Sequence, residues 1–551
     1  MAIADRRFSH DRMAFRDARR TDPSLWSATS ANGMVATAHY LGTAAGVEML
    51  SAGGNAVDAA VAASLALGVC EPAGSGLGGM TVALIHMARP QKTVVLGGPC
   101  RAPRRATPEG LRGRSRYRGH HAVAVPTNAA VLQRALSGYG TLDRAEVLAP
   151  AIRIAEQGFP LTTGQHQLVA VYRRPLRNWG GGRLFLDAAQ RPLPAGTWMR
   201  QQALAATLRR LTTAGFEDFY DGEIAGRIAD DMERNGGFLR QDDLREYSEV
   251  TESSPLEGKF GELQVATLGP PGGGKALLQM FDVYGQLDRS FDPDTPEGVV
   301  LLADIIRQSR LDRRWVNSRA IAHGPEKPRG PRHGELAGAT AGGSRSDRSE
   351  SADESDGEGE TSHVSVADRE GNWVSLTQSL ERSFGAAALN PELGFLYNGY
   401  MRTFKVRNPD HPHFLRPGAP TRSNATPTLL FQDGKPHAAI GNTGSERLAS
   451  GILQVLARLR RQTPFQAVLA PRLHCTPEGQ VLLEAERFPS ESLDALTAKG
   501  YELQRLDAFS FKVGGLQLIV RQGESLCGVA EPRRDGAAGG PSFAGNSGGV
   551  R

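Results

Sequence analysis

One junction, at residue 361, constrains this chain of 551 residues more than any other feature. Residues 342–360 are rich in Gly, Ser and acidic side chains, a composition that cannot pack a core. At Thr361 the pattern changes to the apolar and polar alternation typical of a β-strand. A flexible acidic segment that runs directly into a strand suggests a processing site, and cleavage between Glu360 and Thr361 would make Thr361 an N-terminal residue.

An N-terminal threonine carries a nucleophile and a base on one residue. Its hydroxyl is a poor nucleophile alone, and its α-amine can act as the base that it needs. That amine has an ordinary pKa of about 8, roughly two units below a lysine amine. Taken alone, the junction fits an ordinary linker followed by a hairpin better, so the hypothesis needs support from the rest of the chain.

Six other segments give that support, because they resemble the γ-glutamyltransferase family and occur in its order. They are Gly33–His39, Gly53–Ala63, Glu71–Gly79, Tyr139–Leu142, Leu148–Pro160 and Gly269–Gly274. The junction at Thr361 is similar to that family's self-cleavage point. The resemblance extends from about residue 28 to residue 535.

The resemblance implies an N-terminal nucleophile hydrolase, an α/β (α+β) protein with a four-layer αββα sandwich, matured by an N-to-O acyl shift. It divides the chain into a large subunit, 31–360, and a small subunit, 361–551, which form a heterodimer; pairing of two heterodimers stays open. Residues 1–30 are polar and charged and predict a mobile arm. Residues 323–360 predict a disordered linker.

Alternation and helical spacing predict further elements. Strands are expected from Met34 onward and at 81–87, 93–96, 263–268, 364–366, 373–379, 427–432 and 437–440. Helices are expected at 43–50, 55–67, within 129–157 and 199–234, and at 276–285 and 446–461. Asn55 and Asp58 resemble a capping box, and Gly68 is expected to end that helix.

Other features argue against several function classes. No run of eighteen apolar residues exists, and the N-terminus lacks the apolar stretch of a secretory signal, so we expect no membrane span and a cytoplasmic protein, although many family members are exported. The four cysteines, without a CxxC, predict reduced buried thiols: Cys70, Cys100, Cys475 and Cys527. His411 and His413, separated by proline, lack a third metal ligand.

Neither nucleic acid nor a nucleotide is expected as a partner. The net charge is +5, but the arginine cluster at 101–118 is broken by Pro and Gly and lacks interleaved aromatic residues. Gly74–Gly79 fits GxGxxG but follows a helix, and in Gly269–Lys275 the hydroxyl residue of a phosphate loop is replaced by Ala276. Both glycine runs are interpreted as turns where backbone packs closely.

The catalytic residues are predicted from the resemblance. Thr361 is the nucleophile, and Ser379, on the partner strand, occupies a family position whose hydroxyl bonds the catalytic residue. The backbone N–H groups of Gly444 and Ser445 align with the family glycine pair that holds the oxyanion, at a strand-to-helix turn suited to an anion. No cofactor and no metal are implied.

The residues that would bind glutamate are mostly changed. The family arginine falls at Pro99, with Arg101 displaced by two residues; Glu381 replaces an asparagine; and Tyr400 and Thr403 replace the glutamine and the aspartate, with Arg402 beside them. Ser423 is what remains of a serine pair. Losing the partner of a buried charge costs about 3–5 kcal/mol, so a γ-glutamyl substrate is disfavoured.

The sequence therefore predicts a self-processing hydrolase that cleaves an amide-type acyl bond of a non-standard small substrate through an acyl-Thr361 intermediate, in specialised metabolism such as antibiotic biosynthesis. Three alternatives stay open. They are a hydrolase of C–C bonds in the same family, a genuine γ-glutamyltransferase or glutathione hydrolase, and a non-catalytic scaffold.

Overall fold

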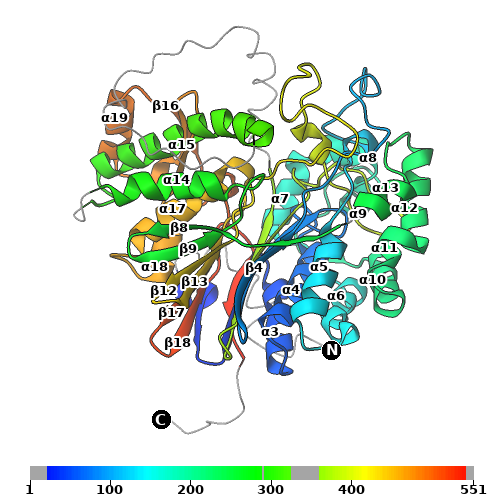
Figure 1. Cartoon of the computed structure of the whole chain (residues 1–551), viewed down its shortest axis with the longest axis horizontal. Helices are drawn as coiled ribbons and strands as arrows, with labels where there is room; N and C mark the ends of the chain where they lie inside the picture. The colour runs from blue at the N-terminus through cyan, green and yellow to red at the C-terminus, as the bar shows by residue number, and fades with distance from the viewer. Residues whose placement is uncertain (1–21, 248, 288–290, 324–358, 542–551) are drawn as a thin grey trace.

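Two antiparallel β-sheets lie face to face through the middle of the molecule, and helices cover both outer faces (Figure 1). The computed structural model describes residues 22–247, 249–287, 291–323 and 359–541. The arrangement confirms the predicted αββα sandwich.

The described residues form two seven-stranded sheets. The first has the order β1 (Ser27–Ser30), β18 (Ser525–Val529), β17 (Gln517–Gln522), β13 (Lys435–Gly441), β12 (Thr428–Gln432), β9 (Leu263–Thr267) and β8 (Leu256–Phe260). The second has the order β19 (Ala537–Gly539), β2 (Gly33–Thr37), β10 (Ser362–Asp368), β11 (Trp373–Ser379), β3 (Met80–Ala88), β4 (Gln91–Gly97) and β7 (Thr251–Ser253).

One helical layer packs on each sheet. Beside the second sheet lie α3 (Tyr40–Ser51), α4 (Ala56–Cys70), α5 (Asn128–Tyr139) and α6 (Arg144–Gln157), followed by α7 (Thr163–Val171), α8 (Arg173–Trp179), α9 (Gly182–Phe185), α10 (Gln202–Ala214), α11 (Asp218–Asp221), α12 (Glu223–Arg234) and α13 (Gln241–Tyr247). Beside the first sheet lie α14 (Gly274–Gly285), α15 (Pro296–His323), α17 (Leu448–Arg458) and α18 (Pro464–Leu469).

Smaller elements complete the chain. A three-stranded sheet of β14 (Leu473–Cys475), β15 (Gln480–Glu484) and β16 (Glu502–Leu506) carries α19 (Ser490–Ala498), and β5 (Phe159–Pro160) pairs with β6 (Trp198–Met199). Short 3₁₀ turns lie at η3 (His120–Ala122), η4 (Tyr400–Thr403), η5 (Ser445–Arg447), η6 (Ala485–Arg487) and η7 (Phe511–Val513).

The hairpin that follows the junction lies in the interior. In β10 and β11 every residue is buried, because α4 covers one face of these strands and the first sheet covers the other. The predicted hairpin is therefore confirmed, with β10 beginning at Ser362. Its position places residue 361 inside the sandwich rather than at its surface.

Several boundaries differ from the sequence predictions. The mobile arm is wrong from residue 22 onward, because α2 (Pro23–Trp26) buries Leu25 and Trp26 and β1 pairs with β18; residues 1–21 lie outside the described residues. The predicted linker is wrong at residues 323, 359 and 360, since α15 extends to His323 and Glu360 is buried, while 324–358 lie outside the described residues. Gly68 does not end its helix, which runs to Cys70 from a capping box of Asn55 and Asp58.

The expectation for the cysteines is met. Cys70, Cys100, Cys475 and Cys527 are free and buried. Among the described helices, none has the length and apolar character to cross a membrane.

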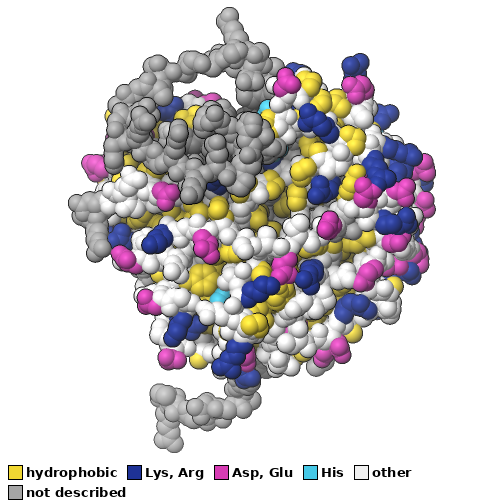
Figure 2. Space-filling model, viewed as in Figure 1, with side chains coloured by type: hydrophobic (Ala, Val, Ile, Leu, Met, Phe, Trp, Pro, Cys, Tyr) yellow, Lys and Arg dark blue, Asp and Glu magenta, His cyan; other side chains and the backbone are white. Residues whose placement is uncertain are grey.

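Acidic side chains accompany many of the arginines. On the face in Figure 2, Lys and Arg intermix with Asp and Glu over the outer helices, and ion pairs such as Arg210–Asp218, 2.6 Å, lie there. Within the arginine cluster, Arg116 and Arg118 donate to the carbonyls of Phe404 and Ser383. These contacts favour the interpretation of the cluster as loop-fixing and surface charge.

The two sheets approach closely where β10 faces β13. His363, buried in β10, contacts the hydroxyls of Thr377 and Ser375 at 2.9 and 3.3 Å, and burial lowers its pKa to about 3. A Cβ atom at Gly441 would overlap the His363 ring, so only glycine fits there. The sandwich therefore needs a neutral imidazole opposite a residue with no side chain.

We expect Gly441→Ala to destabilise the protein by about 1–3 kcal/mol, because an added methyl group in a packed core forces its neighbours apart. Gly226→Ala is the matched control, since a Cβ there meets nothing within 4 Å and alanine favours its helix by up to about 1 kcal/mol. Thermal unfolding measures both changes. Equal midpoints for the two variants would refute the close contact.

Candidate active site

Thr361 lies directly before β10, against the glycine run that follows α4. Thr361 and Glu360 are 5% and 4% exposed. A Cβ atom at Gly74 would lie 3.3 Å from the Thr361 carbonyl carbon, and one at Gly79 would lie 2.6 Å from the Ser379 carbonyl oxygen. The glycine run is thus a close backbone packing site, and it holds the two predicted catalytic residues side by side.

Ser379 connects the nucleophile to the bond that it is predicted to cut. Its hydroxyl donates to the carbonyl oxygen of Glu360 at 2.8 Å and accepts from the Glu381 N–H at 2.8 Å. The Thr361 hydroxyl donates to Ser379 Oγ at 3.3 Å. A hydroxyl oriented by a backbone amide therefore polarises the carbonyl of the 360–361 peptide bond, beside the Thr361 oxygen.

The turn at Gly444 and Ser445 faces the same junction. Their φ angles are +98° and +55°, both left-handed, and within the described residues neither backbone N–H donates a hydrogen bond. The left-handed conformation at Ser445, a residue with a Cβ, is strain of the kind found at functional sites. A side chain at Gly359 would overlap Ser445, so this turn packs against the backbone just before the junction.

A buried ion pair fixes the side chain of Glu360. Arg534 Nη2 lies 2.9 Å from Glu360 Oε2, and it also donates to Thr443 Oγ1 at 3.3 Å. Burial lowers the pKa of Arg534, but the nearby carboxylates of Glu360 and Glu71 outweigh it and hold that pKa above its ordinary value. Sequence reasoning missed Arg534, which follows Glu531, Pro532 and Arg533 in the C-terminal segment.

Glu71 is a second missed residue, although it begins one of the motifs that carry the family resemblance. It accepts a hydrogen bond from Ser362 Oγ, one residue beyond Thr361. Burial raises its pKa from 4.5 to about 7, against the opposing effect of Arg534. A carboxyl group that titrates near neutral pH thus lies beside the predicted nucleophile.

The predicted substrate-binding residues divide into two groups. Tyr400 is buried, which raises its pKa, and the nearby hydroxyls of Ser379 and Ser423 oppose that rise in pKa, so these residues do meet at the site. Glu381 and Arg402 form an ion pair at 2.5 Å, with side chains 11% and 12% exposed, so each neutralises the other. The side chains beside Ser379 therefore have no net charge left to pair with a charged substrate group.

Thr403 and Arg101 have other structural contacts. The Thr403 hydroxyl donates to the Tyr400 carbonyl within η4, at 2.8 Å, and Arg101 donates to the Gly418 carbonyl at 3.1 Å. Neither contacts Thr361 or Ser379 among the described residues. Sequence alignment alone placed them near the site because it carries no information on where a side chain turns.

A cavity of about 520 Å³ opens beside the junction. Its walls include Glu71, Gly74, Glu360, Arg534 and the apolar side chains of Phe159, Leu161, Phe185, Met199 and Phe384. Glu360 is part of the wall nearest to Thr361. Across the described residues, no group of three or more His, Cys, Asp or Glu side chains is arranged to hold a metal ion.

The chain is similar to known proteins along almost its whole length. Residues 42–540 match the sequence model of the family described as Gamma-glutamyltranspeptidase. The chain is 30% identical to the glutathione hydrolase proenzyme of Bacillus subtilis (strain 168), over 92% of this chain and 91% of that protein. It is 32% identical to the acylase ACY 1 proenzyme of Pseudomonas sp. (strain V22), over 92% and 93%.

The fold is similar as well. The crystal structure of cephalosporin acylase from Bacillus halodurans superimposes with a TM-score of 0.79 at 27% identity, covering 94% of this chain and 97% of that one.

The raised pKa of Glu71 predicts a pH dependence of stability. Glutamate in the unfolded chain titrates near 4.5 and folded Glu71 near 7, so the folded state holds the extra proton between these values. Stability then falls as pH rises through this window, by up to about 3 kcal/mol. We expect Glu71→Gln, in a Thr361→Ala background, to raise the thermal midpoint at pH 8 but hardly at pH 4.5.

The parent Thr361→Ala protein is the control at both pH values. An equal gain at pH 4.5 and pH 8 would show that the substitution acts through packing and not through titration.

Proposed function

The chain belongs to the gamma-glutamyltranspeptidase family, and on that premise we propose that it is a self-processing threonine hydrolase that cleaves an amide-type acyl bond of a small substrate. The family places it among the N-terminal nucleophile enzymes. Scission between Glu360 and Thr361 would give fragments 1–360 and 361–551, which stay together as a heterodimer.

The first reaction is the maturation of the chain itself. Thr361 Oγ attacks the carbonyl carbon of Glu360, and a C–O bond forms. The peptide C–N bond breaks and the hydroxyl proton passes to the released nitrogen, which gives an ester and a free α-amine. Water then hydrolyses the ester to a Glu360 carboxylate and the Thr361 hydroxyl. Negative charge develops on the Glu360 oxygen, to which Ser379 already donates at 2.8 Å.

The mature residue repeats this chemistry on a substrate. The Thr361 α-amine accepts the hydroxyl proton, Oγ attacks the substrate carbonyl carbon, and the backbone N–H groups of Gly444 and Ser445 receive the oxyanion. The amine of the substrate leaves with the proton. Water then hydrolyses the acyl-threonine ester and releases the acid.

One observation carries this proposal. The Ser379 hydroxyl bridges the carbonyl oxygen of Glu360 and the hydroxyl of Thr361, at 2.8 and 3.3 Å. An ordinary linker followed by a hairpin has no need for a buried hydroxyl aimed at that one peptide carbonyl.

A substrate other than a γ-glutamyl compound, such as an intermediate of specialised metabolism, is supported by the filled recognition site. A γ-glutamyl group brings an ammonium and a carboxylate, but the ion pair of Glu381 and Arg402 leaves neither residue's charge uncompensated, and Thr403 has no charge. The acylase relative favours hydrolysis of another amide. Hydrolysis of a γ-glutamyl bond is the second candidate, favoured by the relatives named glutathione hydrolase.

Self-cleavage tests the nucleophile and its partner. The purified chain should separate into fragments of 360 and 191 residues on a denaturing gel, and the smaller should begin Thr-Ser-His-Val. Thr361→Ala should stay whole. Ser379→Ala should slow scission by about 10²–10³-fold because it removes the donor to the Glu360 carbonyl.

Ser379→Thr keeps a hydroxyl at the same place and should still be processed. Scission of Ser379→Ala at the wild-type rate would remove Ser379 from the reaction, and a wild-type chain that stays whole would remove the support for the hydrolase.

The choice of substrate is tested with two anilides. We expect kcat/KM for γ-glutamyl-p-nitroanilide to be about a hundredfold or more below that for glutaryl-p-nitroanilide, which lacks only the α-amino group, because the α-ammonium of the former must be buried without a partner. Rapid transfer of the γ-glutamyl group to glycylglycine would instead establish the second candidate.

A further inference from the structure

In the precursor, the acyl group next to the Thr361 hydroxyl is that of Glu360. In the uncut chain its carbonyl carbon is the one that Thr361 Oγ must attack, and its side chain lies in the wall of the 520 Å³ cavity. The precursor therefore shows where one group attached to a reactive carbonyl lies relative to the nucleophile. That group ends in a carboxylate.

Arg534 receives this carboxylate in a buried position. Its Nη2 atom lies 3.0 and 2.9 Å from the two carboxylate oxygens of Glu360, and the two side chains are 9% and 5% exposed. Thr443 adds a hydroxyl within 3.3 Å of the same nitrogen. The contact is a built carboxylate site and not a pair on the surface.

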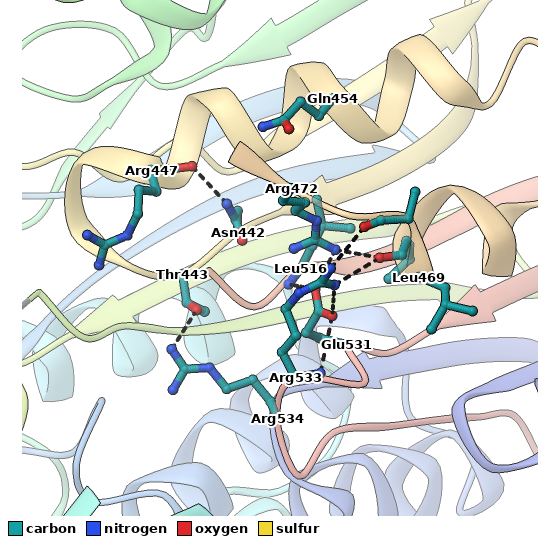
Figure 3. A network of polar contacts seen from close by, with 12 residues as sticks. Asn442, Thr443, Arg447, Gln454, Leu469, Arg472, Leu516, Glu531, Arg533 and Arg534 are labelled. Carbon is teal, nitrogen blue, oxygen red and sulfur yellow. Dashed lines mark hydrogen bonds and ion pairs between the residues drawn. The ribbon is translucent and has the colours of Figure 1, made fainter. Parts of the chain in front are cut away.

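The neighbouring arginine has a different role. Arg533 donates to both Glu484 and Glu531, at 2.6 and 2.8 Å, and its side chain is fully buried. Figure 3 shows Arg533 beside Glu531 and Arg472, while the Arg534 side chain turns away from them toward Thr443. The partners of Arg533 therefore lie away from the scissile bond. The partner of Arg534 is Glu360, which becomes the C-terminal residue of the large fragment after scission.

Maturation releases the covalent constraint that holds Glu360 against Arg534. Once the 360–361 bond is cut and the ester hydrolysed, Glu360 is a chain end with no covalent link to Thr361. Two other carboxylates lie near Arg534. Glu71 has a raised pKa that leaves it partly protonated near neutral pH, and Glu531 already pairs with Arg472 and Arg533. A guanidinium in this cavity then favours an incoming anion, because a buried charge is stabilised only by a partner.

The cavity also selects the body of the ligand. Phe159, Phe185 and Phe384 form aromatic walls, and Leu161 and Met199 add aliphatic surface. Such walls bury apolar groups, and a few polar groups fix the orientation of the ligand. Near Tyr400, by contrast, the ion pair of Glu381 and Arg402 is already complete.

We propose that in the mature enzyme Arg534 exchanges its ion-pair partner: it releases the carboxylate of Glu360 and binds a carboxylate on the acyl group of the substrate. The preferred substrates are then amides of dicarboxylic acids that carry an apolar portion and need no α-ammonium. This specificity role for Arg534 rests on the proposed function, since it requires Thr361 as the acyl acceptor.

Two anilides that differ in one group test the proposal. They are the p-nitroanilides of glutaric acid, with a free terminal carboxylate, and of glutaramic acid, with a terminal primary amide. The processed wild-type enzyme should prefer the acid by about a hundredfold in kcat/KM, mostly through KM. Arg534→Met should lose far more kcat/KM on the acid than on the neutral anilide, so that this preference falls to a few-fold.

Lys512→Met is the matched control, because Lys512 lines the same cavity but does not contact Glu360 among the described residues. It should keep the full preference, and Arg534→Lys should restore part of it. Equal loss on both anilides in Arg534→Met would make Arg534 a structural residue and overturn the proposal. The proposal would also be overturned if the wild-type enzyme preferred anilides that carry the carboxylate on the aniline part and not on the acyl part.

A second measurement does not depend on maturation of Arg534→Met. Glutarate should inhibit the wild type competitively, and about tenfold more strongly than it inhibits Arg534→Lys, while glutaramate should inhibit both weakly. Equal inhibition of both enzymes by glutarate contradicts the proposal. A processed enzyme that hydrolyses only neutral amides would refute the role of Arg534 and leave the proposed function standing. A chain that is never cut would refute the proposed function itself.

Discussion

The hydrogen bond from Ser379 to the carbonyl of Glu360 links the fold of this protein to its chemistry. A peptide group buried at the edge of β10 needs partners, because an unsatisfied buried carbonyl costs about 1–3 kcal/mol. The chain satisfies it with a side-chain hydroxyl instead of a strand neighbour, at 2.8 Å. In the proposed maturation, the bond that stabilises the uncut junction would therefore also polarise it for attack.

Burial of the junction requires compensation of charge as well. Glu360 is almost inaccessible, and Arg534 supplies its counter-charge at 2.9 Å. The position of Arg534 follows from its neighbour, since Arg533 is fixed by Glu484 and Glu531, and Glu531 also pairs with Arg472 at 2.5 Å (Figure 3). This network joins β15, the segment before β14 and the C-terminal segment, so the cavity is framed by parts of the chain far apart in sequence.

Sequence reasoning was accurate where local pattern and backbone geometry decide the outcome. Alternation predicted the hairpin of β10 and β11, and the glycine run at 74–79 was interpreted as a close backbone contact, which the approach of Gly74 to Thr361 confirms. It failed where burial depends on distant partners. The segment at 22–30 is polar, yet Trp26 is buried, and α15 extends to a residue assigned to the linker.

The same distinction separates the two groups of site residues. The predicted catalytic groups are short side chains or backbone amides, whose positions follow from the strands and turns that carry them: Thr361, Ser379, Gly444 and Ser445. Arg101, Glu381, Arg402 and Arg534 are long and charged, and their ends are placed by the partner that each one finds. Glu381 finds Arg402 and Arg101 finds a carbonyl, whereas Arg534 lies in the wall of the cavity beside Thr361 and pairs with Glu360. A catalytic centre made of backbone and small groups can thus be retained by a fold while its substrate changes, since the specificity lies in side chains that can exchange partners without moving a strand.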